Sequence, residues 1–138
     1  MYDKLSEERK KMQEAGTMPE WFSTAGWQLF KDKYLYEAAN PKEQYQRIAN
    51  TAAKYVEQKL PHPKGKVWSQ VFFDLLWNGW LSASTPVLAN TGTNRGLPVS
   101  CSGQYIEDSI DGIYASRRET AILTKHGFGT AGYMAIRP

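Results

Sequence analysis

A stretch rich in hydroxyl residues and glycine, SASTPVLANTGTNRGLPVSCSG at residues 82–103, divides this chain of 138 residues into two parts with different patterns. Before it, apolar residues recur at helical spacing; after it, a short β-type run leads into one further helical segment. The sequence predicts a mainly helical α/β chain, with a helical segment at 1–81 and a second part at 82–138.

Four helices are expected in the first part. Residues 3–15 are strongly charged and predict a solvated surface helix, and Trp27, Phe30 and Tyr34 form an aromatic core stripe on the next one. The tetrapeptide NPKE at 40–43 combines an N-cap, a proline at the first helical position and a glutamate three residues after the cap. A helix should start there and continue to about residue 59. Its expected buried face consists of Tyr45, Ile48, Ala49, Ala52 and Val56.

The run KVWSQVFFDLLWNGW at 66–80 is apolar almost all round, which predicts a fourth helix buried on most of its surface. Fifteen residues are too few for a membrane span, and the N-terminus lacks the apolar core of a signal peptide. The 17 basic and 14 acidic residues balance too evenly to argue for a nucleic-acid partner. His62 lies between two prolines without a neighbouring metal ligand, and we expect it to be a loop residue. A cytoplasmic protein is expected, with no membrane or nucleic-acid partner.

The second part is expected to contain a strand and a helix. VSCSGQYI at 99–106 predicts the strand, with Gly103 hinting at a bulge or a close backbone approach. Asp108 is the expected N-cap of the following helix, with Asp111 at its third position, and Gly127 is the expected left-handed residue after its end. The expected inward face of this helix consists of Ile110, Ile113, Tyr114 and Ala121.

The only cysteine, Cys101, lies among hydroxyl and glycine residues rather than in an apolar run, which favours chemistry over packing. Ser84, Thr85 and Pro86 predict a hydroxyl-bearing proline turn, and a loop with Gly92 and Gly96 follows. Hydroxyls and free backbone N–H groups in such loops suit phosphate oxygens. Both interpretations stay open at this point: a thiol beside a phosphate site, or a turn followed by a packing cysteine.

The order of the motifs STPVLANTG, VSC, IEDSIDGI and KHGFGTAGYMAIRP from residue 82 onward resembles the large (alpha) subunit of class I ribonucleotide reductase, near the start of its catalytic barrel. The helical part at 20–81 is similar to the helical segment that precedes this barrel. The resemblance implies an N-terminal helical segment plus the first strand and helix of a ten-stranded α/β barrel, incomplete in this chain.

The resemblance also implies roles for individual residues. Thr85 and Ser100 would bind the ribonucleoside diphosphate substrate, and Cys101 would be one of two cysteines that reduce it and become a disulfide. The expected binding residues for a nucleoside triphosphate effector are Asp108, Ser109, Ile110 and Arg137. The family further implies a radical-generating small (beta) subunit, an alpha dimer, and thioredoxin or glutaredoxin as reductant. No cofactor or metal is expected on this chain itself.

Thiol count limits what the chain does alone. Ribonucleotide reduction needs a thiyl radical and two further thiols, whereas this sequence holds one cysteine. We therefore expect the N-terminal part of a reductase large subunit, inactive without the remainder of that subunit, as either a piece of a longer protein or a split subunit. The alternative is a stand-alone nucleotide-binding module without catalysis.

Overall fold

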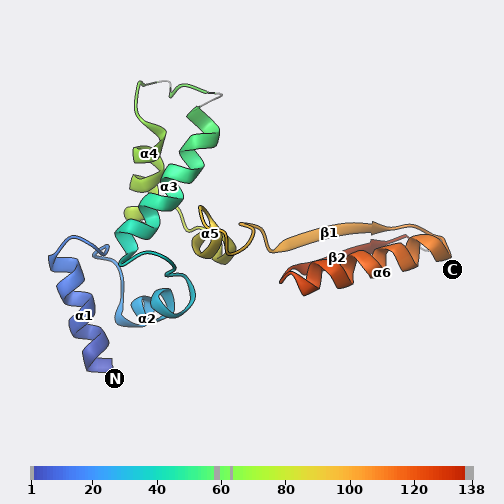
Figure 1. Cartoon of the computed structure of the whole chain (residues 1–138), viewed down its shortest axis with the longest axis horizontal. Coiled ribbons are helices and arrows are strands. Elements are labelled where there is room, and N and C mark those ends of the chain that lie inside the picture. Colours follow the sequence, from blue (N-terminus) through green and yellow to red (C-terminus); the bar gives the residue numbers. More distant parts are fainter. Residues whose placement is uncertain (1, 58–59, 63, 136–138) are drawn as a thin grey trace. The chain divides into compact units, whose positions relative to one another are not determined.

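The computed structural model describes residues 2–57, 60–62 and 64–135, which form two compact units, residues 1–98 and 99–138. The first unit contains five helices in the described residues, and the second contains a strand, a helix and a second strand (Figure 1). The predicted division at residue 82 concerns where a catalytic barrel would begin, and it stays a prediction.

Helices α1 (Tyr2–Glu14), α2 (Thr24–Lys33) and α3 (Pro41–Glu57) follow the predicted order. The start of α3 is the expected one: the Asn40 side chain accepts the backbone N–H of Glu43 at 3.0 Å, and the Glu43 carboxylate accepts the N–H of Ala39 at 2.8 Å. Helix α2 begins with Ser23, whose hydroxyl accepts the N–H of Gly26. The predicted continuation of α3 to residue 59 lies outside the described residues.

The core of the first unit is aromatic. Trp27 and Phe30 are buried as the stripe predicts, and Phe30 packs edge-on against Tyr34 and Tyr45. On α3, Ala53 is buried where Ala52 was expected, and Ala52 and Val56 are half-buried. The buried members of the core cluster are Met18, Phe22, Trp27, Phe30, Tyr45, Ile48, Ala49, Phe73 and Leu76.

Helix α4 (Trp68–Trp77) lies against α3, but the prediction that most of its surface is buried is wrong. Only Phe73 and Leu76 are buried on it, and Trp80 just beyond its end is 78% exposed. Apolar residues lie on all sides of α4, but among the described residues α3 packs against one side of it. Helix α5 (Thr85–Asn90) follows as a turn and a half of helix where a proline turn was expected, because proline is tolerated at the start of a helix.

The second unit is a β-α-β arrangement: strand β1 (Cys101–Ile106), helix α6 (Ile110–Lys125) and strand β2 (Gly129–Met134). The strands pair in parallel and in continuous register from Cys101 with Gly129 to Ile106 with Met134. The sequence predicted a single strand, at 99–106, so strand β2 at residues 129–134 was not anticipated. No bulge interrupts the pairing at Gly103, and no other atom lies within 4 Å of the position of an added Cβ there.

Helix α6 runs along the two strands (Figure 1), but its inward face differs from the predicted one. Ile110 and Tyr114 are 72% and 65% exposed, while Ser116 is buried and Thr120 hydrogen-bonds with Gln104 of β1. The helix ends as predicted at Gly127, with φ +86°; the N–H groups of Gly127 and Phe128 bond back to the last turn. No helix in the described part of the chain is long and apolar enough to cross a membrane.

Candidate functional site

Thr85 is the first residue of α5, preceded by Ser84 in extended conformation. The Thr85 side chain is exposed, and its hydroxyl oxygen lies 3.4 Å from the phenol oxygen of Tyr34, which follows α2. Two oxygen-bearing groups from segments 51 residues apart thus meet at the surface of the first unit. The sequence pattern singled out Thr85 for binding but gave Tyr34 only a place in the core stripe.

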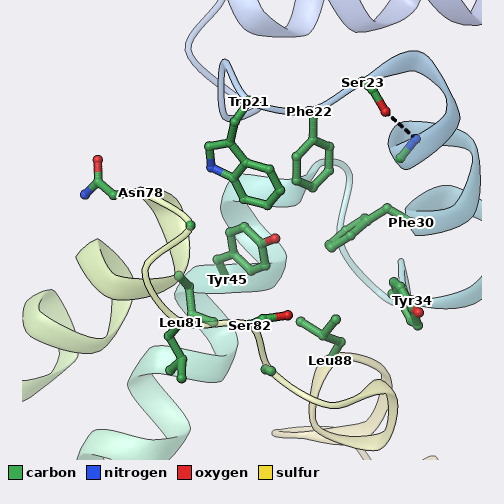
Figure 2. Close-up of a pocket in the computed structure, with 14 residues that line it drawn as sticks. Trp21, Phe22, Ser23, Phe30, Tyr34, Tyr45, Asn78, Leu81, Ser82 and Leu88 are labelled. Carbon is green, nitrogen blue, oxygen red and sulfur yellow. Dashed lines mark hydrogen bonds between the residues drawn. The ribbon is translucent and has the colours of Figure 1, made fainter.

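A pocket of about 610 Å³ opens beside this pair, between the loop before α2 and the segment that links α4 to α5 (Figure 2). The ring N–H of Trp21 donates to the carbonyl oxygen of Trp77 at 2.8 Å, which fixes one wall. Burial raises the pKa of Tyr45, so this phenol stays neutral. The lining residues are Trp21, Phe22, Ser23, Gly26, Phe30, Tyr34, Tyr45, Leu76, Asn78, Gly79, Leu81, Ser82, Ala83 and Leu88. None of them carries a formal charge.

Gln44 of α3 holds the segments around this pocket together. Its side chain is fully buried, and its amide nitrogen donates to the backbone carbonyls of Tyr34 at 2.5 Å and Leu88 at 2.6 Å. Its amide oxygen accepts the N–H of Tyr36 at 3.3 Å. One amide therefore joins the end of α2 and the middle of α5 to α3. Sequence reasoning missed this residue; the available signal was that Gln44 shares a helical face with Ile48.

Arg47, one turn further along α3, holds the other end of α5. Its guanidinium donates to the carbonyl oxygens of Tyr36 and Thr91. Burial lowers the pKa of Arg47, and the charge of Glu37 acts in the opposite direction. The backbone of Gly92, at φ +75°, lies against the Arg47 stem, where an added Cβ would stand 3.0 Å from Cγ.

The glycine-containing loop after α5 is closed by its own polar groups. The Asn90 side chain donates to the carbonyl of Leu97 at 2.9 Å, and the Thr93 hydroxyl donates to the carbonyl of Asn90 at 2.8 Å. The same hydroxyl oxygen accepts the N–H of Arg95. These contacts hold residues 90–97 in a closed turn.

Cys101 begins β1 and its thiol is exposed. The hydroxyl of Ser100 lies 3.9 Å from the Cys101 sulfur, and the Ser100 carbonyl accepts the N–H of Gly129 at 2.7 Å. The parallel strand thereby fixes the backbone on which both side chains stand. An exposed thiol is accessible to a reactant, as the chemical interpretation of Cys101 requires.

The proposed effector residues lie at the other end of β1. Ser109, not Asp108, is the N-cap of α6: its hydroxyl oxygen accepts the N–H of Gly112 at 3.0 Å. The prediction for Asp108 as cap is wrong by one residue, because the serine side chain reaches the third N–H of the helix from an extended backbone. Ile110 presents its side chain to solvent.

The structure thus groups the predicted residues only in part. Ser100 and Cys101 are adjacent, while residues 108–110 lie beyond the opposite end of β1, roughly 17 Å away at about 3.3 Å per residue. Thr85 belongs to the first unit, and Arg137 lies outside the described residues. His62 accepts the N–H of Lys64, as a loop residue would, and the described residues hold no group of three or more metal-ligating side chains.

Comparison with known proteins identifies the family. Residues 20–96, which lie inside the first unit and include α2 to α5, match the model of the ribonucleotide reductase all-alpha domain. The chain belongs to the ribonucleotide reductase large-subunit family. It corresponds to an N-terminal part of that subunit, so the resemblance noted in the sequence is confirmed.

Relatives and a solved structure extend the match across most of the chain. The "Vitamin B12-dependent ribonucleoside-diphosphate reductase" of Mycobacterium tuberculosis is 30% identical over 122 residues, 84% of this chain and 18% of that protein. The "Ribonucleoside-diphosphate reductase subunit alpha" of Helicobacter pylori is 32% identical over 110 residues, 78% of this chain and 14% of that protein. The class Id ribonucleotide reductase alpha subunit of Actinobacillus ureae superposes with a TM-score of 0.68 at 34% identity, covering 86% of this chain and 22% of that subunit. The chain therefore spans less than a fifth of these two curated relatives.

Proposed function

We propose that this chain is the part of a ribonucleotide reductase large subunit that supplies one of the two reducing thiols, Cys101, for the conversion of ribonucleoside diphosphates to deoxyribonucleotides. The observation that carries the proposal is the exposed thiol of Cys101 at the start of β1, in a chain of this family. The relatives' names give the substrate class, ribonucleoside diphosphates.

The reaction defines what Cys101 can contribute. Replacing the 2′ hydroxyl of the ribose by hydrogen takes two electrons: two thiols lose their protons and one electron each, a disulfide forms, and the oxygen leaves as water. A thiyl radical on a third cysteine takes the 3′ hydrogen and returns it at the end. This chain holds one cysteine, so the other two thiols come from the remainder of the alpha subunit.

Thr85 and Ser100 are the proposed substrate-binding residues. Both carry hydroxyls, which donate to phosphate or sugar oxygens and accept in return. The Ser100 hydroxyl stands beside the Cys101 thiol at 3.9 Å, and the Thr85 hydroxyl is exposed at the start of α5. We propose that the Ser100 hydroxyl contacts the ribose near the thiol and that the Thr85 hydroxyl contacts the diphosphate, as the resemblance implies.

Asp108, Ser109, Ile110 and Arg137 are the proposed effector-binding residues for a nucleoside triphosphate. The Ser109 oxygen caps α6, yet its hydroxyl proton stays available to a ligand. The exposed Ile110 side chain offers an apolar contact, and the length of β1 separates this group from Cys101. Effector and substrate would therefore be bound at separate sites.

The second unit supports the proposed barrel. One face of the two-stranded sheet is covered by α6, while Cys101, Gly103 and Tyr105 are exposed along the other face. Parallel strands in globular proteins are normally buried on both faces. We propose that strands from the remainder of the alpha subunit continue this sheet into a ten-stranded α/β barrel.

The proposed partners follow from class I of the family. They are a radical-generating small (beta) subunit, a second alpha subunit in a dimer, and thioredoxin or glutaredoxin, which reduces the disulfide after each turnover. The Mycobacterium tuberculosis relative is named for vitamin B12 instead. The test therefore includes both radical sources.

A chimeric alpha subunit tests the proposal. This chain replaces the matching segment of the Actinobacillus ureae class Id alpha subunit, and deoxyribonucleotide formation is measured with the small subunit or with a vitamin B12 cofactor. We expect turnover with the small subunit and none from the isolated chain, which lacks two thiols. Turnover by the isolated chain contradicts the proposal, as does an assembled chimera that binds a ribonucleoside diphosphate without reducing it. That second result would favour a nucleotide-binding module.

A further inference from the structure

Two hydroxyl groups of the first unit form a pair whose spacing suits a ligand better than it suits each other. The phenol oxygen of Tyr34 and the hydroxyl oxygen of Thr85 are 3.4 Å apart. Hydrogen bonds between hydroxyls are usually about 2.7–2.8 Å long, so this contact is weak. One hydroxyl proton takes no part in this contact and the other is held only weakly, so both can donate to a third oxygen that lies at bonding distance from each.

The surrounding structure fixes the position of the Tyr34 phenol. The Tyr34 ring packs edge-on against Phe30, with centroids 5.8 Å apart, and its backbone N–H donates to the Phe30 carbonyl at 2.9 Å. The Gln44 amide binds the Tyr34 carbonyl and, with the same nitrogen, the Leu88 carbonyl in α5. The backbones of Tyr34 and of the helix that carries Thr85 are thus held by one buried side chain.

Neighbouring hydroxyls are less suited to the same task. The Ser23 hydroxyl caps α2 by accepting the N–H of Gly26, as the dashed line in Figure 2 shows, whereas the hydroxyl that lies beside Thr85 in the described residues is that of Tyr34. Tyr45 lines the same pocket, but the residue is only 4% exposed and packs on Phe30. Tyr34 is half-buried, with its ring held in the core and its oxygen beside the exposed Thr85.

We propose that Tyr34 is a second phosphate-binding residue, which donates its phenol proton to the same phosphate group as Thr85. This inference rests on the proposed function, in which Thr85 binds the substrate diphosphate. Phosphate oxygens only accept hydrogen bonds, and bonds to a charged acceptor are stronger than bonds between neutral groups. The pocket beside the pair has no charged lining residue. An anion that binds there is therefore held by neutral hydrogen-bond donors such as these two hydroxyls.

Nuclear magnetic resonance of the isotope-labelled full chain tests the pair. The probes are inorganic pyrophosphate and cytidine diphosphate, with cytidine as the control that lacks phosphate. We expect the two phosphate compounds to shift the Thr85 and Tyr34 amide signals, and cytidine to leave them unchanged. Tyr34→Phe should weaken the binding of both phosphate compounds about tenfold, since it removes one hydrogen bond to a charged group.

Matched variants separate binding from folding. Tyr55→Phe removes a phenol hydroxyl from an exposed tyrosine on another helix, α3, and should leave binding unchanged. Thr85→Val should weaken binding as Tyr34→Phe does, and Thr85→Ser, which keeps the hydroxyl, should restore it. Tyr34→Phe keeps the ring contact with Phe30, so its thermal midpoint should stay close to that of the unmodified chain.

The possible results distinguish the two proposals. If Thr85→Val weakens binding and Tyr34→Phe does not, the role of Tyr34 is refuted while Thr85 keeps its proposed function. If pyrophosphate and cytidine diphosphate leave the Thr85 signal of the unmodified chain unchanged, the phosphate-binding role of Thr85 itself is wrong. A Tyr34→Phe variant that loses binding only in proportion to a loss of folded protein also refutes the inference, because the role is then structural.

Discussion

Replacing Gln44 with leucine should remove a substantial part of the stability of the first unit. The substitution keeps side-chain volume nearly constant, but it leaves the carbonyls of Tyr34 and Leu88 and the N–H of Tyr36 without their partner. Each buried polar group without a partner costs about 1–3 kcal/mol, so three groups give roughly 3–9 kcal/mol. Access of water and the apolar gain from leucine reduce this, and we expect a loss of about 3–5 kcal/mol. The total free energy of unfolding of a small domain is only about 5–15 kcal/mol.

Urea unfolding followed by tryptophan fluorescence measures this loss in the full chain. All five tryptophans lie in the first unit, so the signal reports on that unit alone; they are Trp21, Trp27, Trp68, Trp77 and Trp80. Gln46→Leu is the control, because Gln46 makes one exposed hydrogen bond, to Asn50 on the same helix. We expect it to cost less than about 0.5 kcal/mol. A Gln44→Leu loss below about 1 kcal/mol would refute the bridging role of Gln44.

Two further predictions concern the same unit. Gly92→Ala should cost about 2–4 kcal/mol, because it combines a left-handed backbone with a clash against Thr51 and Arg47, whereas Gly65→Ala, at φ +64° in open space, should cost about 1 kcal/mol. Equal losses in the two variants would contradict the clash. Because burial raises the pKa of Tyr45, the folded state keeps that proton when the unfolded state loses it, so stability should fall as pH rises above about 10. The contribution of Tyr45 to this fall in the free energy of unfolding approaches about 1.4 kcal/mol per pH unit, and it should be absent in Tyr45→Phe. If the unfolding free energies of the two proteins fall equally with pH above about 10, Tyr45 does not contribute.

Local sequence signals predicted the helices well where one short motif determined the result. NPKE at 40–43 fixes the start of α3 through contacts within four residues, and the spacing of Trp27 and Phe30 alone identifies the buried face of α2. The cap of α6 was misplaced because Asp108 and Ser109 are both good capping residues, and only the backbone geometry decides between them. Capping propensity alone therefore cannot decide which of two adjacent capping residues is the N-cap.

Long-range pairing explains the other differences. Strand β2 forms because Gly129 to Met134 pair with β1, and a glycine-rich tail carries no strand signal of its own. The apolar surround of α4 predicted burial, yet one side of this helix has no partner among the described residues. The chain spans a minor part of its curated relatives, so such a pattern is expected where packing partners lie in the remainder of the subunit.

Sequence motifs name the residue types of the candidate site but not their arrangement, and the roles of these residues stay predictions. Thr85, Ser100 and Cys101 were recognisable from their motifs, and the exposed thiol agrees with the chemical interpretation of Cys101. The pairing of Tyr34 with Thr85, and the Gln44 amide that fixes it, join residues 44 to 51 positions apart. No local pattern encodes contacts over that separation.

Replacing Cys101 with serine in the chimeric alpha subunit tests the central claim most directly. Serine keeps the size and hydrogen bonding of the side chain but cannot form a disulfide, so deoxyribonucleotide formation per folded enzyme should stop. Binding of a ribonucleoside diphosphate should persist, and effector binding at residues 108–110 should persist because that site lies beyond the other end of β1. The matched control is Ser102→Ala, which changes a half-buried neighbour on the opposite face of the strand and should leave turnover intact. Undiminished turnover by the Cys101→Ser enzyme would contradict the account, because Cys101 would then take no part in the reduction.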